Sequence, residues 1–289
     1  MRTINAGRLM LDGGAMFGSV PRPMWSRKIA PDELNRIPMA MRCMLVEAAG
    51  QRILIDNGMG TKEDERFLEI HGVSDDAGRK LEDSLANAGV APADIDVVVC
   101  THLHFDHAGG NTELQDGALR PAFPNARYIV RRDEWELAHL DSEKIRAAYM
   151  LQHFDPLEEA GVLELVDDEL ELVPGVRLLH TPGHTPGHQS VLVEVGKETI
   201  CFLADLVPTR AHVRPLWIMS YDLEPLVTFE TKKRVLERAG VEGWTLVFEH
   251  DPWIAAARAA PNPTGMGCTI AEDIRDESTE AFNEEGIAG

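Results

Sequence analysis

The chain of 289 residues carries 48 acidic and 28 basic side chains, a formal net charge of −20. This charge disfavours nucleic acid and anionic membrane surfaces as partners, because both are bound through clustered Lys and Arg. The four cysteines are widely spaced, so we expect them to be thiols in the core and not disulfides. We also expect a cytoplasmic protein, because the N-terminus lacks the apolar core of a signal peptide and no apolar run is long enough to span a membrane.

The first sixty residues predict a strand at 4–11, a long irregular loop and a β-hairpin. The loop covers residues 15–38 and carries large apolar side chains among its prolines: Met16, Phe17, Met24 and Trp25. Apolar residues in so long a loop argue against disorder, so it could be a lid over a site, a homodimer contact or a segment packed on the core. Residues 41–46 and 52–56 flank Ala49-Gly50-Gln51, a pattern typical of a hairpin.

Helices are expected at 62–70 and 76–88, before the β-branched run 95–100, which predicts a buried strand. Four side chains that can bind a metal follow this strand within six residues: His102, His104, Asp106 and His107. Side chains two apart in an extended chain point the same way, so the first two can hold one metal. The other two follow where the chain must turn and can face a second metal.

After a strand at 126–130 and a helix at 132–140, the chain returns to strands between 162 and 204. Three histidines lie close together in His180-Thr-Pro-Gly-His184-Thr-Pro-Gly-His188. His184 lies at the loop apex between two Pro-Gly turns, from which its side chain can project into a cleft. His180 and His188, at the strand ends, could support it from outside.

The segment 206–221 is aromatic and basic within an acidic protein and begins beside Asp205, which ends the apolar run 200–204. We expect this segment to form the substrate wall, together with the apolar residues of the 15–38 loop. Its candidate residues are His212, Trp217 and Tyr221. A helix at 228–239 and a strand at 244–248 follow, and that strand leads to His250. Residues 263–289 predict a flexible acidic tail after a single domain at 1–262.

The run His102-Leu-His-Phe-Asp-His107 resembles the H-x-H-x-D-H motif of metallo-β-lactamase-fold hydrolases, and later ligands of that family follow in order. The resemblance covers roughly residues 40 to 250 and is nearest to N-acyl homoserine lactone lactonases and methyl parathion hydrolase-like members. It implies an α/β fold arranged as an αββα sandwich. It also implies two Zn²⁺ ions, with Mn²⁺, Fe²⁺ or Co²⁺ as other suitable metals. The implied ligands are His102, His104 and His184 for one ion, Asp106, His107 and His250 for the other, and Asp205 as the bridge.

This resemblance implies attack by a metal-bridging hydroxide, with Asp106 passing a proton to the leaving group. Redox di-iron relatives carry Glu where this chain has His104, which favours a hydrolase. The lactonases carry a tyrosine three residues after the bridging Asp, but Pro208 stands there in this chain. His212 or Tyr221 could take that tyrosine's place.

The apolar segments predict that the substrate is a lactone or another neutral carboxylic ester, held through its acyl or aryl body. A phosphotriesterase or arylesterase is the alternative, as is a glyoxalase II-like thioester hydrolase, although the C-terminal part lacks basic residues to grip glutathione. A metal-binding scaffold without activity would keep the ligands but would need no apolar pocket.

Overall fold

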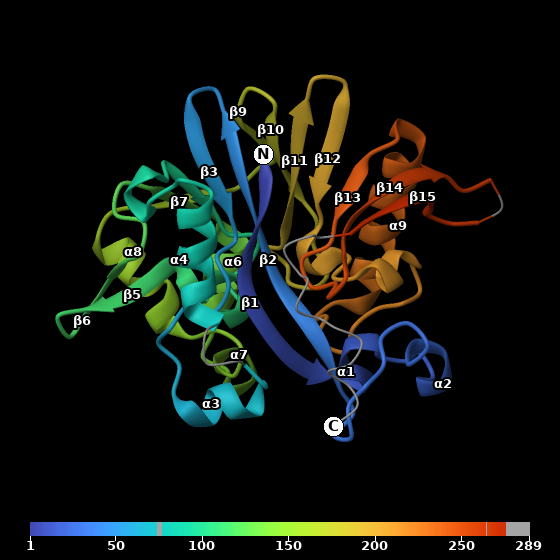
Figure 1. Cartoon of the computed structure of the whole chain (residues 1–289), viewed down its shortest axis with the longest axis horizontal. Helices are drawn as coiled ribbons and strands as arrows, with labels where there is room; N and C mark the ends of the chain where they lie inside the picture. Colours follow the sequence, from blue (N-terminus) through green and yellow to red (C-terminus); the bar gives the residue numbers. More distant parts are fainter. Residues whose placement is uncertain (74–76, 264, 276–289) are drawn as a thin grey trace.

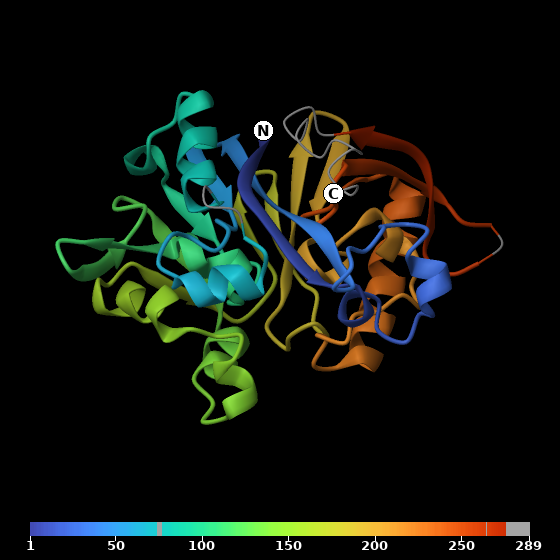
Figure 2. The same cartoon turned by 60° about the horizontal axis from the view of Figure 1, so that its bottom comes forward.

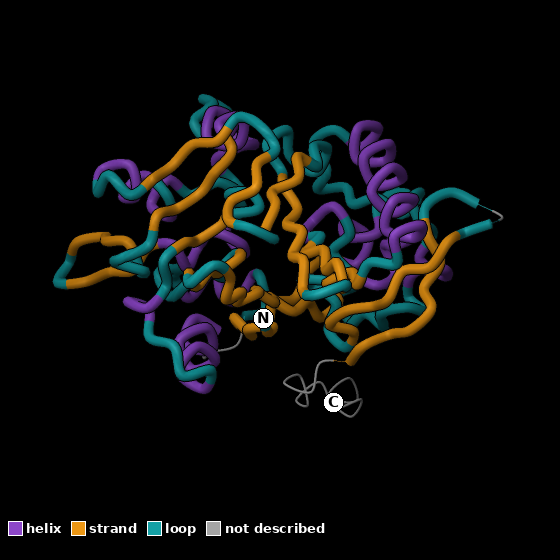
Figure 3. Tube along the Cα trace, turned by 90° about the horizontal axis from the view of Figure 1, so that it is seen from above, coloured by secondary structure: helices purple, strands orange, loops and turns teal. Residues whose placement is uncertain are grey.

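A computed structural model of the chain describes residues 1–73, 77–263 and 265–275. Two β-sheets pack face to face at the centre, and helices cover the outer face of each sheet (Figures 1 and 3). This arrangement is the αββα sandwich that the sequence resemblance implied.

The first sheet has the strand order β1-β2-β3-β4-β7-β8. Its strands are β1 (Arg2–Asp12), β2 (Arg36–Ala48), β3 (Gln51–Ile55), β4 (Val97–Val99), β7 (Arg127–Arg131) and β8 (Leu163–Val166). β2 and β3 form the predicted hairpin, in which Ala48 pairs with Gln51. Ala49 and Gly50 have φ angles of 51° and 78°, the positive values that a two-residue turn between twisted strands requires.

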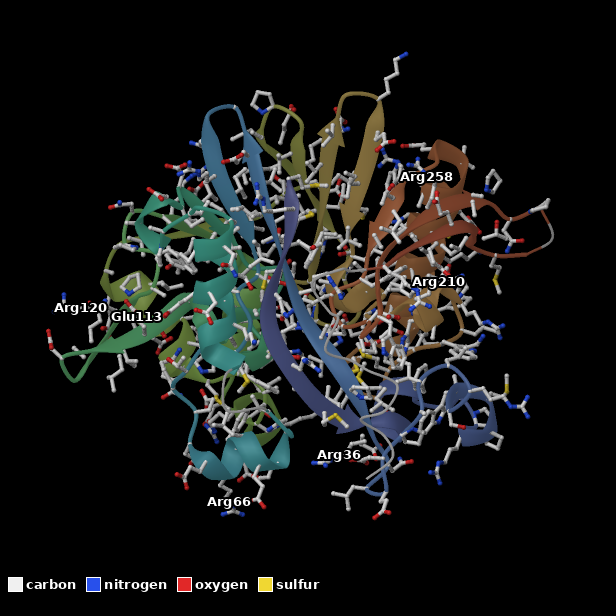
Figure 4. All side chains as sticks on the ribbon, viewed as in Figure 1. Arg36, Arg66, Glu113, Arg120, Arg210 and Arg258 are labelled. Atoms are coloured by element: carbon white, nitrogen blue, oxygen red, sulfur yellow. The ribbon has the colours of Figure 1, made fainter. Side chains whose placement is uncertain are left out.

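The second sheet has the order β15-β14-β13-β12-β11-β10-β9. Its strands are β9 (Leu170–Val173), β10 (Val176–His180), β11 (Gln189–Val195), β12 (Glu198–Phe202), β13 (Thr245–Val247), β14 (Ile254–Pro261) and β15 (Cys268–Arg275). A separate hairpin joins β5 (Thr112–Gln115) to β6 (Ala118–Pro121). Glu113 and Arg120, which are paired in its register, project together from the side of the molecule (Figure 4).

Side chains that alternate along β4 pack into two different apolar cores, one on each face of the first sheet. Val97 and Val99 pack between the two sheets, against residues such as Val191 and Phe202 of the second sheet. Val98, between them, packs into the core under the helices. Because both faces of β4 are buried, its sequence is continuously apolar rather than alternating.

The helices are short except for α4 and α9. They are α1 (Gly13–Phe17), α2 (Arg22–Trp25), α3 (Glu65–Ile70), α4 (Ala77–Asn87), α5 (Phe105–Ala108), α6 (Arg132–Ala138), α7 (Glu143–Arg146), α8 (Asp155–Glu159) and α9 (Pro225–Glu242). α9 covers the outer face of the second sheet, where Leu236 and Trp244 belong to the same apolar cluster as Leu246. No helix among the described residues is long and apolar enough to cross a membrane.

Two expectations from the sequence need correction. The 15–38 segment is not irregular throughout, because it contains α2, most of α1 and the first residues of β2. Buried Phe17 and Trp25 pack its first half on the core, which is one of the three roles expected for it. The tail predicted from residue 263 is wrong for Cys268–Arg275, which pair with β14 as the edge strand β15. An edge strand needs only one apolar face, so its exposed acidic residues resembled a tail. Arg210 lies beside this strand and binds Asp273 at 2.5 Å (Figure 4). The rest of the predicted tail, 276–289, lies outside the described residues.

All four cysteines are buried and carry free thiols, as predicted.

Candidate metal centre

The candidate ligands come together where strands of both sheets end. His102 and His104 follow β4, and Asp106 and His107 lie in α5. His184 lies between β10 and β11, while Asp205 and His250 follow β12 and β13. These strands run away from the β2–β3 and β11–β12 hairpins, so the ligands gather at the opposite edge, which Figure 2 brings forward.

A first group of ligand atoms is formed by three imidazoles. Nε2 of His102 and Nε2 of His184 each lie 3.0 Å from Nδ1 of His104. Oδ2 of Asp205 lies 3.0 Å from His184 Nε2 and 3.8 Å from His102 Nε2. Such spacings suit atoms that surround one ion at bond lengths of about 2.0–2.2 Å.

A second group faces the first across Asp205. Nε2 of His250 lies 3.1 Å from Nε2 of His107 and 3.7 Å from Oδ2 of Asp106. Oδ1 of Asp205 lies 3.1 Å from His250 Nε2, whereas Oδ2 points to the first group. The two oxygens of this carboxylate are therefore placed to serve both groups.

Hydrogen bonds on the far side of several of these rings fix which nitrogen faces the centre. Nδ1 of His107 donates to Oδ2 of Asp56 at 3.1 Å, and Nδ1 of His184 donates to Oδ1 of Asp222 at 2.8 Å. Thr101 links the two groups, because its backbone N and its hydroxyl both donate to Asp56 while the hydroxyl accepts from His102 Nδ1. Partners of this kind orient metal-binding histidines. Asp56 thus supports the ligands through these bonds.

Burial lowers the pKa of His102 and of His104 well below the usual 6.5, which keeps both rings neutral with a lone pair available. Burial alone would also lower the pKa of His184 and of His250. The Asp205 carboxylate outweighs it and raises these pKa values to about 10 and about 9. The centre therefore attracts positive charge, which a proton or a metal ion can supply.

The donor set fits metal ions. Oδ1 of Asp205 is buried and has no hydrogen-bond partner among the described residues, and burying a polar atom in this way is costly unless a ligand engages it. Imidazole nitrogen and carboxylate oxygen without thiolate suit Zn²⁺, and also Mn²⁺, Fe²⁺ or Co²⁺. The atoms within each of the groups His102, His104, His184, Asp205 and Asp106, His107, His250 lie within 4.8 Å of one another.

Glu134 is a buried carboxylate beneath the first group that carried no sequence signal. It accepts a 2.9 Å hydrogen bond from the backbone N of Leu103 and a 2.5 Å bond from the Thr185 hydroxyl. These donors adjoin the ligands His104 and His184, so Glu134 joins the two loops that carry them. Its backbone lies against Gly187, where an added Cβ would come within 2.2 Å of Glu134 N.

Five of the candidate ligands, His104, Asp106, His184, Asp205 and His250, line a cavity of about 320 Å³. Beyond the ligands it is lined by Leu11, Met16, His71, Phe105, Lys144, Ile145, Ala147, Ala148, Tyr149, Met219, Ser220, Tyr221 and Leu223. Most of these side chains are apolar, so the cavity suits a neutral organic group. The wall around α7 and Tyr149 was not anticipated from the sequence, because a short helix of mixed residues carries no motif.

Of the residues expected to contact substrate, Met16 and Tyr221 line this cavity. Phe17, Trp25 and Trp217 do not. They pack in the core, where Phe17 stacks on Trp25 at 5.4 Å and meets Trp217 edge-on at 5.6 Å. We expected these apolar residues to form the wall of the substrate site, but they are apolar because they pack in the core. Met24 is 46% exposed and lies outside the cavity lining.

His212, for which a catalytic role was expected, is also not among the residues that line the cavity. This residue is buried and stacks on Phe17 at 4.6 Å. Its Nε2 bonds the carbonyl of Met16 at 2.9 Å, and its Nδ1 bonds the Thr209 hydroxyl at 2.7 Å. Both ring nitrogens are therefore committed within the core. Nothing in the sequence distinguished His212, which lies seven residues after the predicted ligand Asp205, from a histidine that faces the site.

The chain is similar in sequence or fold to one known protein family and to three known proteins. Residues 41–250 match the family described as the Metallo-beta-lactamase superfamily. An N-acyl homoserine lactonase of Bacillus thuringiensis is 30% identical over 261 residues, which are 86% of this chain and 91% of that protein. A probable metal-dependent hydrolase from Staphylococcus aureus shares the fold, with a TM-score of 0.87 and 31% identity over 96% of both chains. A solved N-acyl homoserine lactone hydrolase, with N-hexanoyl-L-homoserine at its catalytic metal centre, has a TM-score of 0.66 and 28% identity over 86% of this chain and 92% of that one.

Proposed function

Because this chain belongs to the metallo-β-lactamase superfamily, we propose that it is a two-metal hydrolase of lactones or other neutral carboxylic esters. The observation that carries the proposal is the composition of the cavity, in which two groups of metal-binding atoms meet a mostly apolar wall. The similarity to N-acyl homoserine lactonases adds support for a cyclic ester.

The wall binds the substrate through burial of its acyl or aryl body, at about 25 cal/mol per Å² of apolar surface. Ile145, Ala148 and Met219 supply such surface close to the ligands. The net charge of −20 slows the approach of multiply charged anions, which favours a neutral ester over a nucleotide or phosphodiester.

Metal ions bound to these groups would polarise the ester carbonyl and lower the pKa of a coordinated water to about 7. Asp106 belongs to the second group and lines the cavity, which supports a role in accepting a proton after attack and returning it to the leaving alkoxide. Tyr221 also lines the cavity and is 39% exposed; partial burial and the nearby carboxylates of Asp106 and Asp205 raise the pKa of its hydroxyl to about 12. That hydroxyl stays protonated at neutral pH and can donate a hydrogen bond to the substrate carbonyl.

A substrate panel tests this proposal. Zinc-loaded protein should hydrolyse γ-lactones with acyl substituents and aryl carboxylic esters, with a phosphotriester as a slower substrate. A phosphodiester and a glutathione thioester are the comparison compounds. Faster turnover of either comparison compound than of every lactone and ester would reject the substrate class, while leaving the metal groups in place.

A further inference from the structure

Strand β2 of the first sheet is bonded to the segment of the second sheet that carries His250. Ala40 N donates to the carbonyl of His250 at 3.1 Å, and Arg42 N donates to the carbonyl of Glu249 at 3.2 Å. Nδ1 of His250 donates to the carbonyl of Ala40 at 2.7 Å. This last bond leaves the lone pair of His250 on Nε2, the atom that faces the second group of ligands.

The guanidinium of Arg42 adds a second set of bonds to the same segment. Its Nη1 donates to the carbonyls of Phe248 at 2.5 Å and Glu249 at 3.3 Å, and its Nη2 donates to the carbonyl of Asp251 at 3.1 Å. Arg42 is only 2% exposed, although its guanidinium is always charged. A buried charge is tolerated where hydrogen-bond acceptors surround it, and here the acceptors are carbonyls on both sides of His250.

These bonds are important because the residues of the second group of ligands follow strands of both sheets. Asp106 and His107 follow β4 of the first sheet, whereas His250 follows β13 of the second. The two sheets meet mainly through apolar side chains, whose packing is not directional. Hydrogen bonds are directional, so the fork of Arg42 can fix where His250 lies relative to His107.

We infer that Arg42 is a positioning residue for the second metal, because it holds His250 at the place where a metal bound by Asp106 and His107 needs a third ligand. This inference rests on the proposed two-metal function. A lysine at this position would keep the charge, but its single ammonium cannot reach carbonyls that the planar fork spans.

The test is a zinc titration of metal-free protein against a chromogenic chelator, in Arg42→Lys and in the matched control Arg36→Lys. Arg36, labelled in Figure 4, begins the same strand, and its guanidinium pairs with Asp32 instead of with the carbonyls of the His250 segment. We expect Arg42→Lys to weaken the second zinc equivalent by roughly 10–100-fold, the usual cost of losing a group that orients a ligand. The first equivalent, and both equivalents in Arg36→Lys, should bind as in the wild type.

Three results would separate the possible failures. Unchanged binding of both equivalents in Arg42→Lys would overturn the inference, as would equal weakening of both in a folded protein, which indicates a general structural role. A single equivalent in the wild type would instead reject the two-metal function.

Hydrogen exchange of the wild type provides a measurement that does not depend on whether the variant folds. If Arg42 arranges His250 before metal binds, the amides of Ala40 and Arg42 are protected in the metal-free protein. Rapid exchange of both amides until zinc is added would overturn the inference.

Discussion

Tyr149 donates a 2.8 Å hydrogen bond through its hydroxyl to Oε1 of Glu134, while its ring lies 4.8 Å from that of His104. Tyr149 lines the cavity, and Glu134 lies beneath the first group of ligands. The cavity wall and the metal-binding loops are therefore joined through one buried carboxylate. A change at either place should be transmitted to the other.

Glu134→Ala should destabilise the metal-free protein and loosen the first group of ligands. The change leaves buried donors on Leu103, Thr185 and Tyr149 without their acceptor, at about 1–3 kcal/mol for each group that finds no new partner. Denaturant unfolding measures the loss. Glu136→Ala, an exposed change on the same helix, is the control. Equal stability of the two variants would contradict the proposed role.

Asp106→Asn should reduce kcat by roughly 10²-fold or more, because the amide cannot accept the proton released during attack. The substitution keeps the size of the side chain and one oxygen for the metal. Metal content must be measured on the same sample, so that loss of the ion is distinguished from loss of the proton acceptor. Near-normal kcat at full metal occupancy would show that Asp106 carries no proton.

The sequence pointed to these candidate ligands because they are close together in the chain or lie at strand ends. Four ligands occupy residues 102–107, and the others each follow an apolar run that predicts a strand. Strand ends that share one sheet edge meet in space, so ligands far apart in sequence could be placed together. The fold could be predicted because the family resemblance covers roughly residues 40 to 250.

The cavity wall could not be predicted in this way. Tyr149 and Ile145 reach the cavity from a helical region with no motif, whereas Trp25 and Trp217 belong to the core. An apolar side chain in an irregular segment has the same sequence signal whether it faces a ligand or the protein interior. Glu134 was missed because a buried carboxylate differs from a solvated one only in its tertiary partners.

Trp25→Ala should lower stability without changing the preference for acyl-chain length. Trp25 is 2% exposed, stacks on Phe17 and lies outside the cavity lining, so its removal leaves a core void costing about 3–5 kcal/mol. KM for a series of lactones of increasing chain length, measured well below the melting temperature, should follow the wild-type trend. A lost trend would place Trp25 in the substrate site.

The stability of the metal-free protein should fall as the pH rises above neutrality. Asp205 raises the pKa of His250 to about 9 and of His184 to about 10 against the opposing effect of burial. A histidine whose pKa is higher in the folded protein than in the unfolded chain stabilises the folded state. This stabilisation is complete below the unfolded pKa of 6.5 and is lost as the pH rises through the folded pKa. Unfolding free energy measured in chelator should therefore decline between pH 6.5 and about 8, below the range in which Lys62 and Lys232, whose pKa burial lowers to about 8, begin to oppose it. A rise in stability over this range would contradict the assigned charges.

The two-metal function is tested most directly by adding Zn²⁺ stepwise to protein whose metal has been removed with a chelator. Lactone hydrolysis is measured after each addition. Activity and bound metal should be followed together on one sample. We expect negligible hydrolysis without metal, and a rise in activity that ends sharply at two equivalents per chain, since both groups of ligands must be filled. Full activity at one equivalent, or activity that persists in the stripped protein, would contradict the two-metal function.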